Sequence, residues 1–220
     1  MAEHPPTGTG GSPTRQGFFE TPAVSDAMDG LGLPSAVVVG LSPVAGAPGP
    51  VAGPARTATV VNCEDPGIPG LAEYLDEAAE GDLLVLGWAA TSVASVWGGL
   101  AATCTAARGC VGLVTDGWVR DADEVRSLPL TVWASGSVPR SGKGRLAVTG
   151  VGESTEVSGV LVHDRDVVVA DSTGVCVVPA AHVTEVLDAA EGLQRRDGLF
   201  RQALATGAGF GDARARAGTM

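Results

Sequence analysis

The chain has 220 residues, 45 % of them hydrophobic, and its 14 basic and 25 acidic side chains give a net charge of -11. That length and apolar content suit one hydrophobic core, so a single domain is expected. An acidic chain with no basic patch and few aromatic residues is a poor direct partner for nucleic acid. No apolar run approaches the ~20 residues that a membrane helix needs, and neither a secretory leader nor a zinc-type cysteine spacing is present. We therefore expect a cytoplasmic protein with reduced cysteines and no membrane segment.

Segments rich in glycine, proline and small polar residues lie at the two ends of the chain. Residues 1–16 are predicted to be a disordered tail and residues 208–220 a flexible one, because neither has apolar surface to bury. One α/β domain is expected between them, at 17–207.

Apolar patterning within this domain predicts alternating helices and strands. Helices are expected after a capping Ser25, at 69–82, at 98–109 and from 180 to about 206. Short β-branched runs predict strands at 36–40, 53–62, 82–87, 110–117, 130–134, 159–162, 166–171 and 174–179. The last two strands should form a hairpin through Ser172, Thr173 and Gly174, which makes the sheet mixed.

The helix–strand unit at 98–121 places its two ends close together. A helix of ten residues spans ~15 Å and a strand of five returns ~16 Å, so Gly98 and Gly99 should lie near Arg120 and Asp121. Paired glycines at a helix N-terminus admit an anion, an arginine fork binds carboxylates, and an aspartate offers hard oxygens for Mg²⁺. The pattern indicates a site for a carboxylate substrate chelated to a cation. The alternative is that Arg120 and Asp121 are ordinary surface charges near a helix start.

Several motifs together resemble one family, the proteins grouped with regulator of ribonuclease activity A and the 4-hydroxy-4-methyl-2-oxoglutarate aldolases. They span about residues 18–207 in the family's order. The matching pieces are VSDAMDGLG, GPARTATV, GDLLVLG, GGLAATCTAARGCVGLVTDGWVRDADE, LPLTVWASGSVP and DVVVADSTGVCVVP. The resemblance implies a layered β/β/α domain with a mixed sheet and a long C-terminal helix, assembled as homotrimers or homohexamers with sites between subunits.

The resemblance also implies an activity: a carbon–carbon lyase like the metal-dependent (class II) pyruvate aldolases, which cleaves or decarboxylates small 2-oxo acids through a pyruvate enolate. Arg120 would hold the substrate carboxylate together with Gly98, Gly99 and the N–H of Leu100. Asp121 would bind Mg²⁺ or Mn²⁺.

This sequence departs from the family at one important position. Active aldolases carry an acidic residue that is separated from the Arg-Asp pair by twenty residues, and here that position is Gly99. Nearby acids could compensate, with Glu124, Asp116 and Asp123 as alternatives, and Glu124 matches an acid found three residues after the family's pair. Two other functions stay open: an enzyme with a redirected reaction, and a non-catalytic regulator that binds another protein. An Arg120–Asp121 ion pair with no cavity above Gly98 and Gly99 would favour the regulator.

Overall fold

The computed structural model describes residues 19–34, 36–46 and 49–218, so the tail expected at 1–16 lies outside the described residues. The helices are α1 (Thr21–Gly30), α2 (Leu71–Asp76), α3 (Gly99–Ala107), α4 (Ala122–Arg126), α5 (Val183–Ala205, after a 3-10 turn at Ala180–His182) and α6 (Phe210–Ala217). Among the described residues, no helix is both long and apolar enough to cross a membrane.

The strands form one large sheet, a small sheet and a hairpin. The large sheet contains β1 (Val37–Val38), β2 (Ser42–Ala45), β3 (Val51–Asn62), β4 (Leu83–Trp88), β6 (Gly112–Thr115), β8 (Thr131–Ala134), β10 (Leu146–Thr149), β13 (Val167–Ala170) and β14 (Val175–Val178). The small sheet contains β5 (Ser95–Trp97), β7 (Trp118–Val119) and β9 (Gly136–Ser137). The hairpin pairs β11 (Thr155–Val157) with β12 (Val160–Val162).

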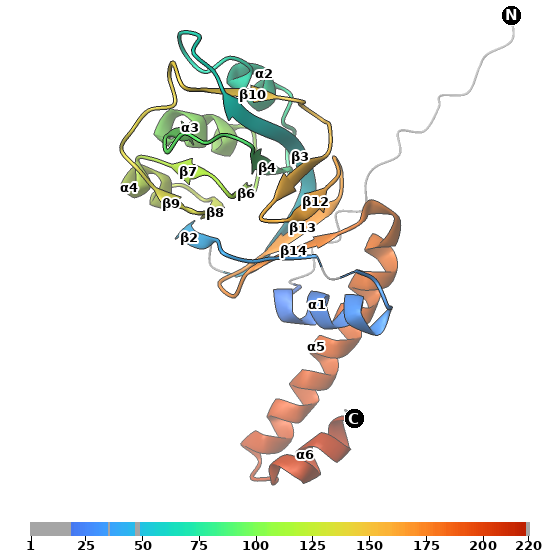
Figure 1. Ribbon diagram of the computed structural model, residues 1–220. Coiled ribbons are helices and arrows are strands. Elements are labelled where there is room, and N and C mark those ends of the chain that lie inside the picture. Colours follow the sequence, from blue (N-terminus) through green and yellow to red (C-terminus); the bar gives the residue numbers. More distant parts are fainter. Residues whose placement is uncertain (1–18, 35, 47–48, 219–220) are drawn as a thin grey trace, which may run out of the picture.

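The large sheet is mixed, as expected, with the order β1-β14-β13-β3-β4-β6-β8-β2 and β10 beside β3. Strands β3, β4, β6 and β8 run parallel to one another, whereas β13 and β14 form the predicted antiparallel hairpin. The long helix α5 lies against α1 beside this hairpin and extends away from the sheet (Figure 1). The α/β class and the long C-terminal helix are therefore confirmed.

Strand β4 shows how the layers form. Its alternate residues Leu84 and Leu86 lie in the core beneath α2 and α3, while Leu83 and Val85 lie in a second core shared with β13 and β14. Because both faces are covered, the strand is apolar throughout instead of alternating with polar residues. A third cluster joins β13 and β14 to α1 and α5, which completes the β/β/α layering.

Three segments differ from the sequence prediction. Helix α1 begins at Thr21, not after Ser25, because the distant Asp171 accepts hydrogen bonds from the Thr21 N–H and hydroxyl, both at 2.8 Å. Helix α2 ends at Asp76, since the Asp82 carboxylate accepts the N–H of Ala79 at 2.9 Å and turns the chain. The tail expected at 208–220 contains helix α6, which packs on α5.

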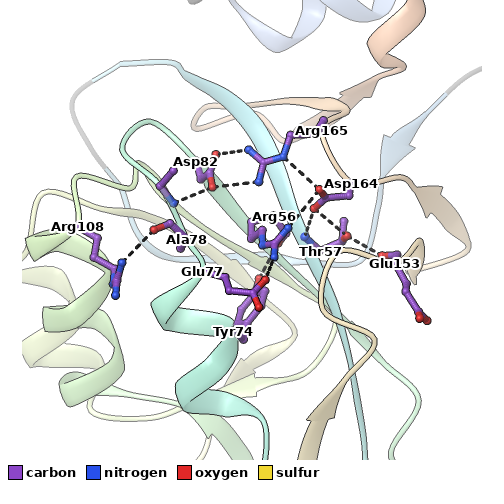
Figure 2. Close-up of polar contacts among 11 residues, drawn as sticks. Arg56, Thr57, Tyr74, Glu77, Ala78, Asp82, Arg108, Glu153, Asp164 and Arg165 are labelled. Atoms are coloured by element: carbon purple, nitrogen blue, oxygen red, sulfur yellow. Dashed lines mark hydrogen bonds and ion pairs between the residues drawn. The ribbon is translucent and has the colours of Figure 1, made fainter. Parts of the chain in front are cut away.

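A network of charges holds the layers together where β4 begins (Figure 2). The fully buried carboxylate of Asp82, directly before β4, pairs with Arg165 at 2.7 Å. Arg165 also contacts Asp164 at 3.1 Å, and Asp164 contacts Arg56 of β3 at 3.3 Å. Arg56 reaches Glu77 after α2. The network thus connects β3, the turn before β4 and the turn before β13.

Candidate functional site

The small sheet brings the two ends of the predicted unit together. Strand β5 leads into α3, and the adjacent parallel strand β7 leads into α4. The backbone N–H of Arg120, directly after β7, donates to the carbonyl of Trp97 at 3.1 Å. Arg120 and Asp121 therefore lie beside Gly98 and Gly99 at the start of α3, as the length argument predicted.

Gly98 makes this close approach possible. A Cβ atom at this position would lie 2.6 Å from Cγ of Arg120 and 2.8 Å from Oδ2 of Asp121. Both distances are shorter than van der Waals contact, so any side chain at residue 98 would displace the two functional groups.

Asp121 directs its carboxylate at the N-terminus of α3. It precedes α4 in a left-handed conformation with φ of 54°, but its side chain makes no capping hydrogen bond to α4. Instead, Oδ2 accepts the N–H of Gly99 at 3.0 Å and lies 3.2 Å from Nε of Arg120. A carboxylate is stabilised there by the free N–H groups and partial positive charge of the helix start. An ordinary surface acid at this position would cap its own helix.

Glu124 lies over Gly99, the position at which the family's acid is missing. A Cβ atom at residue 99 would be 2.1 Å from Oε2 and 2.3 Å from Cδ of Glu124. The Glu124 carboxylate therefore occupies the space in which a side chain of residue 99 would begin. Sequence reasoning included Glu124 only as one of three alternatives. The available signal was its spacing, since residues three apart lie on the same side of a helical turn.

The remaining predicted residues differ in their access to this site. Leu100 follows in the first turn of α3, where backbone N–H groups lack helical partners, and its side chain is 84 % exposed. The side chains of Arg120 and Asp121 are 36 % and 40 % exposed, so a ligand can reach both. Asp123 points elsewhere and pairs with Arg126 at 2.8 Å.

Asp116 has different neighbours. Its two carboxylate oxygens accept the N–H groups of Trp88 and Ser158, each at 2.8 Å. Burial raises the pKa of Asp116 above its ordinary value, although these hydrogen bonds oppose the shift. Asp116 lines a cleft of about 410 Å³ between β4 and the β11–β12 hairpin. Both Asp116 oxygens are thus engaged in connecting the hairpin to the end of β4.

The donor set at Gly99 fits a hard divalent cation. Asp121 and Glu124 supply two carboxylates, and Mg²⁺ is commonly held by one or two carboxylates with water completing the shell. Within the described residues, no group of three or more His, Cys, Asp and Glu side chains could enclose a metal. The arrangement therefore suits an open site, in which water and a chelating substrate provide the other ligands.

The fold and this site define an α/β protein with carboxylates and an arginine gathered at one helix start. The chain belongs to the RraA-like family, because the family model described as Aldolase/RraA matches residues 21–177.

Individual relatives are distant. An uncharacterized protein of Methanocaldococcus jannaschii is 30 % identical over 113 residues, or 51 % of this chain and 54 % of that protein. The chain thus spans about half the length of this relative, and 31 % of another curated relative. A putative 4-hydroxy-4-methyl-2-oxoglutarate aldolase of Halalkalibacterium halodurans is 25 % identical, with 84 % of each chain covered. The crystal structure of Streptomyces coelicolor RraAS2, described as an unusual member of the RNase ES inhibitor RraA protein family, has a TM-score of 0.75 at 26 % identity, covering 82 % of this chain and 91 % of that one.

Proposed function

We propose that the protein is a divalent-metal-dependent carbon–carbon lyase, an aldolase or decarboxylase, that acts on a small 2-oxo acid and releases pyruvate. The observation that carries this proposal is the position of the Glu124 carboxylate over Gly99, beside Asp121 and Arg120. It provides an acid where the family's acid is absent from the sequence. The aldolase name of the Halalkalibacterium halodurans relative supports the same reaction class.

Each residue has a distinct proposed role. Asp121 and Glu124 would hold Mg²⁺ or Mn²⁺, which supplies Lewis acidity toward the 2-oxo oxygen of the substrate. Arg120 binds the carboxylate next to that 2-oxo group, and the N–H groups at the start of α3 bind its second oxygen. Gly98 leaves room for the substrate to approach the backbone. Together these contacts orient the bond that breaks.

The Arg120–Asp121 ion pair favours the alternative of a protein-binding regulator, since a guanidinium already paired with the metal ligand is less available to substrate. The structural similarity to Streptomyces coelicolor RraAS2, which is described as a member of the RNase ES inhibitor family, also supports this alternative. The third alternative, an enzyme whose site acts on another substrate, would also need Arg120 and Asp121. A direct assay separates these functions.

The test is pyruvate release from 4-hydroxy-4-methyl-2-oxoglutarate and from oxaloacetate, with Mg²⁺, with Mn²⁺ and with EDTA. Asp121→Asn should abolish metal-dependent turnover, whereas the control Asp123→Asn, two residues away and directed outward, should keep it. An absence of turnover with either metal and both substrates would reject the proposed lyase. Turnover that survives Asp121→Asn would reject the proposed metal site.

A further inference from the structure

A cleft of about 410 Å³ opens between the end of β4 and the β11–β12 hairpin, and it shares no residue with the site at Gly99. The hairpin lies close to β4 because Gly87 has no side chain: a Cβ atom there would overlap the hydroxyl of Thr155. At its turn, the hairpin is held by the N–H of Ser158, which donates to the Asp116 carboxylate at 2.8 Å. Two specific contacts thus hold the wall of the cleft in place.

The lining of the cleft carries negative charge that no basic residue in it balances. Of the nine residues that line it, Asp116 and Glu156 are acidic and none is basic. Glu156 is exposed, whereas Asp116 is half-buried. Burial and, to a smaller extent, the charge of Glu156 raise the pKa of Asp116, while the N–H groups of Ser158 and Trp88 oppose that rise. The two carboxylates thus act on one another within a partly enclosed space, where a cation would relieve their repulsion.

Hydroxyl groups and apolar side chains complete the lining. Oγ1 of Thr59 lies 2.8 Å from Oγ1 of the buried Thr155, and both oxygens keep lone pairs that accept further hydrogen bonds. Leu161, which is 56 % exposed, and Trp88 add apolar surface. An indole is also the aromatic group that attracts cations most strongly. This combination suits a small organic ligand with a cationic end better than a metal ion, which prefers oxygen ligands alone.

The position of the cleft in the sheet also favours a ligand. Trp88 is the last residue of β4, and Asp116 directly follows β6, so both lie at the carboxyl ends of two adjacent parallel strands. Ligands of open α/β sheets usually bind in crevices outside these carboxyl ends. The volume of about 410 Å³ is also within the range of known small-molecule sites, roughly 300–1,000 Å³. The cleft therefore has the place and the size of a small-molecule site.

We propose that this cleft binds a small organic cation with a primary ammonium group, held by the carboxylates of Asp116 and Glu156. An ammonium group has three donors and no acceptor, which suits a lining of carboxylates and hydroxyl groups. Each Asp116 oxygen already accepts one N–H, but a carboxylate has about four acceptor positions, so it can bind an ammonium group as well. The same chemistry is offered by a free amine and by a lysine side chain of another protein. The enclosed volume of the cleft favours the free amine.

The test is ¹⁵N NMR of the full chain titrated with butylammonium as the probe and with 1-butanol as its neutral counterpart. The N–H groups of Trp88 and Ser158 donate to Asp116, so their signals report on the cleft. The N–H of Gly99 donates to Asp121 and reports on the proposed metal site. Butylammonium should shift the Trp88 and Ser158 signals to saturation, whereas 1-butanol should leave them in place.

Two variants and one further ligand define the site. Glu156→Gln should weaken butylammonium binding about tenfold, because a hydrogen bond to a charged group typically contributes that much. Glu153→Gln is the matched control, since Glu153 is an exposed acid three residues away that does not line the cleft, and it should bind like the parent. The further ligand is Nα-acetyl-lysine methylamide, which presents a lysine side chain and should bind no more tightly than butylammonium.

Four results would overturn the proposal. The first is the absence of saturable shifts at Trp88 and Ser158 in the folded parent. The second is equal affinity of the parent and Glu156→Gln for butylammonium, because the charge of the cleft would then be irrelevant. The third is a shift at Gly99 alone, which would place the cation at the proposed metal site. The fourth is markedly tighter binding of the lysine derivative, which would assign the cleft to a lysine of another protein.

Discussion

The carboxylate of Glu124 lies against the Cα of Gly99, so that a Cβ atom on residue 99 would be 2.1 Å from Oε2. The Glu124 side chain thus fills the space that a side chain at residue 99, 25 positions earlier in the chain, would need. Residue 99 itself has no carboxylate, but Glu124, in the first turn of α4, places one beside it. If the carboxylate matters and its origin does not, moving it back to residue 99 should preserve the site.

An exchange of the two residues tests this relationship. Glu124→Ala should lower Mn²⁺ affinity about tenfold or more, since removing even an outer-shell partner of a metal ligand has an effect of this size. Adding Gly99→Asp to Glu124→Ala should recover part of that loss, because a carboxylate then extends from residue 99 at the start of α3. Gly99→Asp alone should be unfavourable, since it places two carboxylates together. A double variant no better than Glu124→Ala would argue against the exchange.

Arg120 should affect both substrate binding and turnover. Arg120→Ala removes the guanidinium that we propose binds the substrate carboxylate, and kcat/KM should fall about 100-fold, which corresponds to roughly 2.7 kcal/mol. The expected pattern is a higher KM with a lower kcat, because the arginine also orients the bond that breaks. Arg126→Ala, at the end of the adjacent helix α4, is the matched control. Steady-state kinetics that do not distinguish the two variants would be inconsistent with this role.

The charge network of Figure 2 should make folding sensitive to acid. Burial alone would raise the pKa of Asp164, but the N–H of Thr57 and the guanidinium groups of Arg165 and Arg56 together hold it below its ordinary value. A lowered folded-state pKa contributes stability above the unfolded value of about 3.9, and this contribution is lost as pH falls through the folded value. Asp164→Asn should therefore be less stable by about 1–3 kcal/mol at pH 7. The difference should shrink in acid.

Urea unfolding of both proteins at neutral and acidic pH measures this effect. The free energies of unfolding of the parent and of Asp164→Asn should converge as pH falls below about 4. A gap between parent and Asp164→Asn that stays constant with pH would mean that the carboxylate's charge contributes nothing to stability.

The four cysteines should divide into two reactivity classes. Cys110 and Cys176 are buried, and burial raises the pKa of each thiol to about 11, so almost no thiolate forms near neutrality. Cys63 and Cys104 are partly exposed. Iodoacetamide at mildly alkaline pH should label the second pair first, and label Cys110 and Cys176 only after denaturant is added. Early labelling of Cys110 or Cys176, detected by peptide mass spectrometry, would contradict the buried assignment.

Much of the fold follows from local patterns. The apolar runs of β3, β4 and β6 and the hairpin of β13 with β14 were predictable, because a strand covered on both faces has few other sequence solutions. The start of α1 was not, since it depends on Asp171, which is 150 positions away. The strands of the small sheet are two or three residues long, too short for a periodic signal.

Part of the candidate site was also predictable, from the lengths of the helix and strand that lead to it. Element lengths alone bring Arg120 to Gly98, because a helix and a strand of known rise return the chain to one edge. They do not determine where a side chain points. The Glu124 carboxylate reaches Gly99 only because Asp121 adopts a left-handed conformation that sets the direction of α4, and no spacing rule contains that information.

The most direct test of the proposed metal site is the binding of Mn²⁺ itself, followed by electron paramagnetic resonance of the free ion. The parent protein and Asp123→Asn should each bind one Mn²⁺ per chain with equal affinity. Glu124→Gln should bind it about tenfold more weakly, and Asp121→Asn should not bind it measurably. Equal Mn²⁺ affinity in all four proteins would contradict a metal site at Asp121 and Glu124, and with it the proposed lyase mechanism.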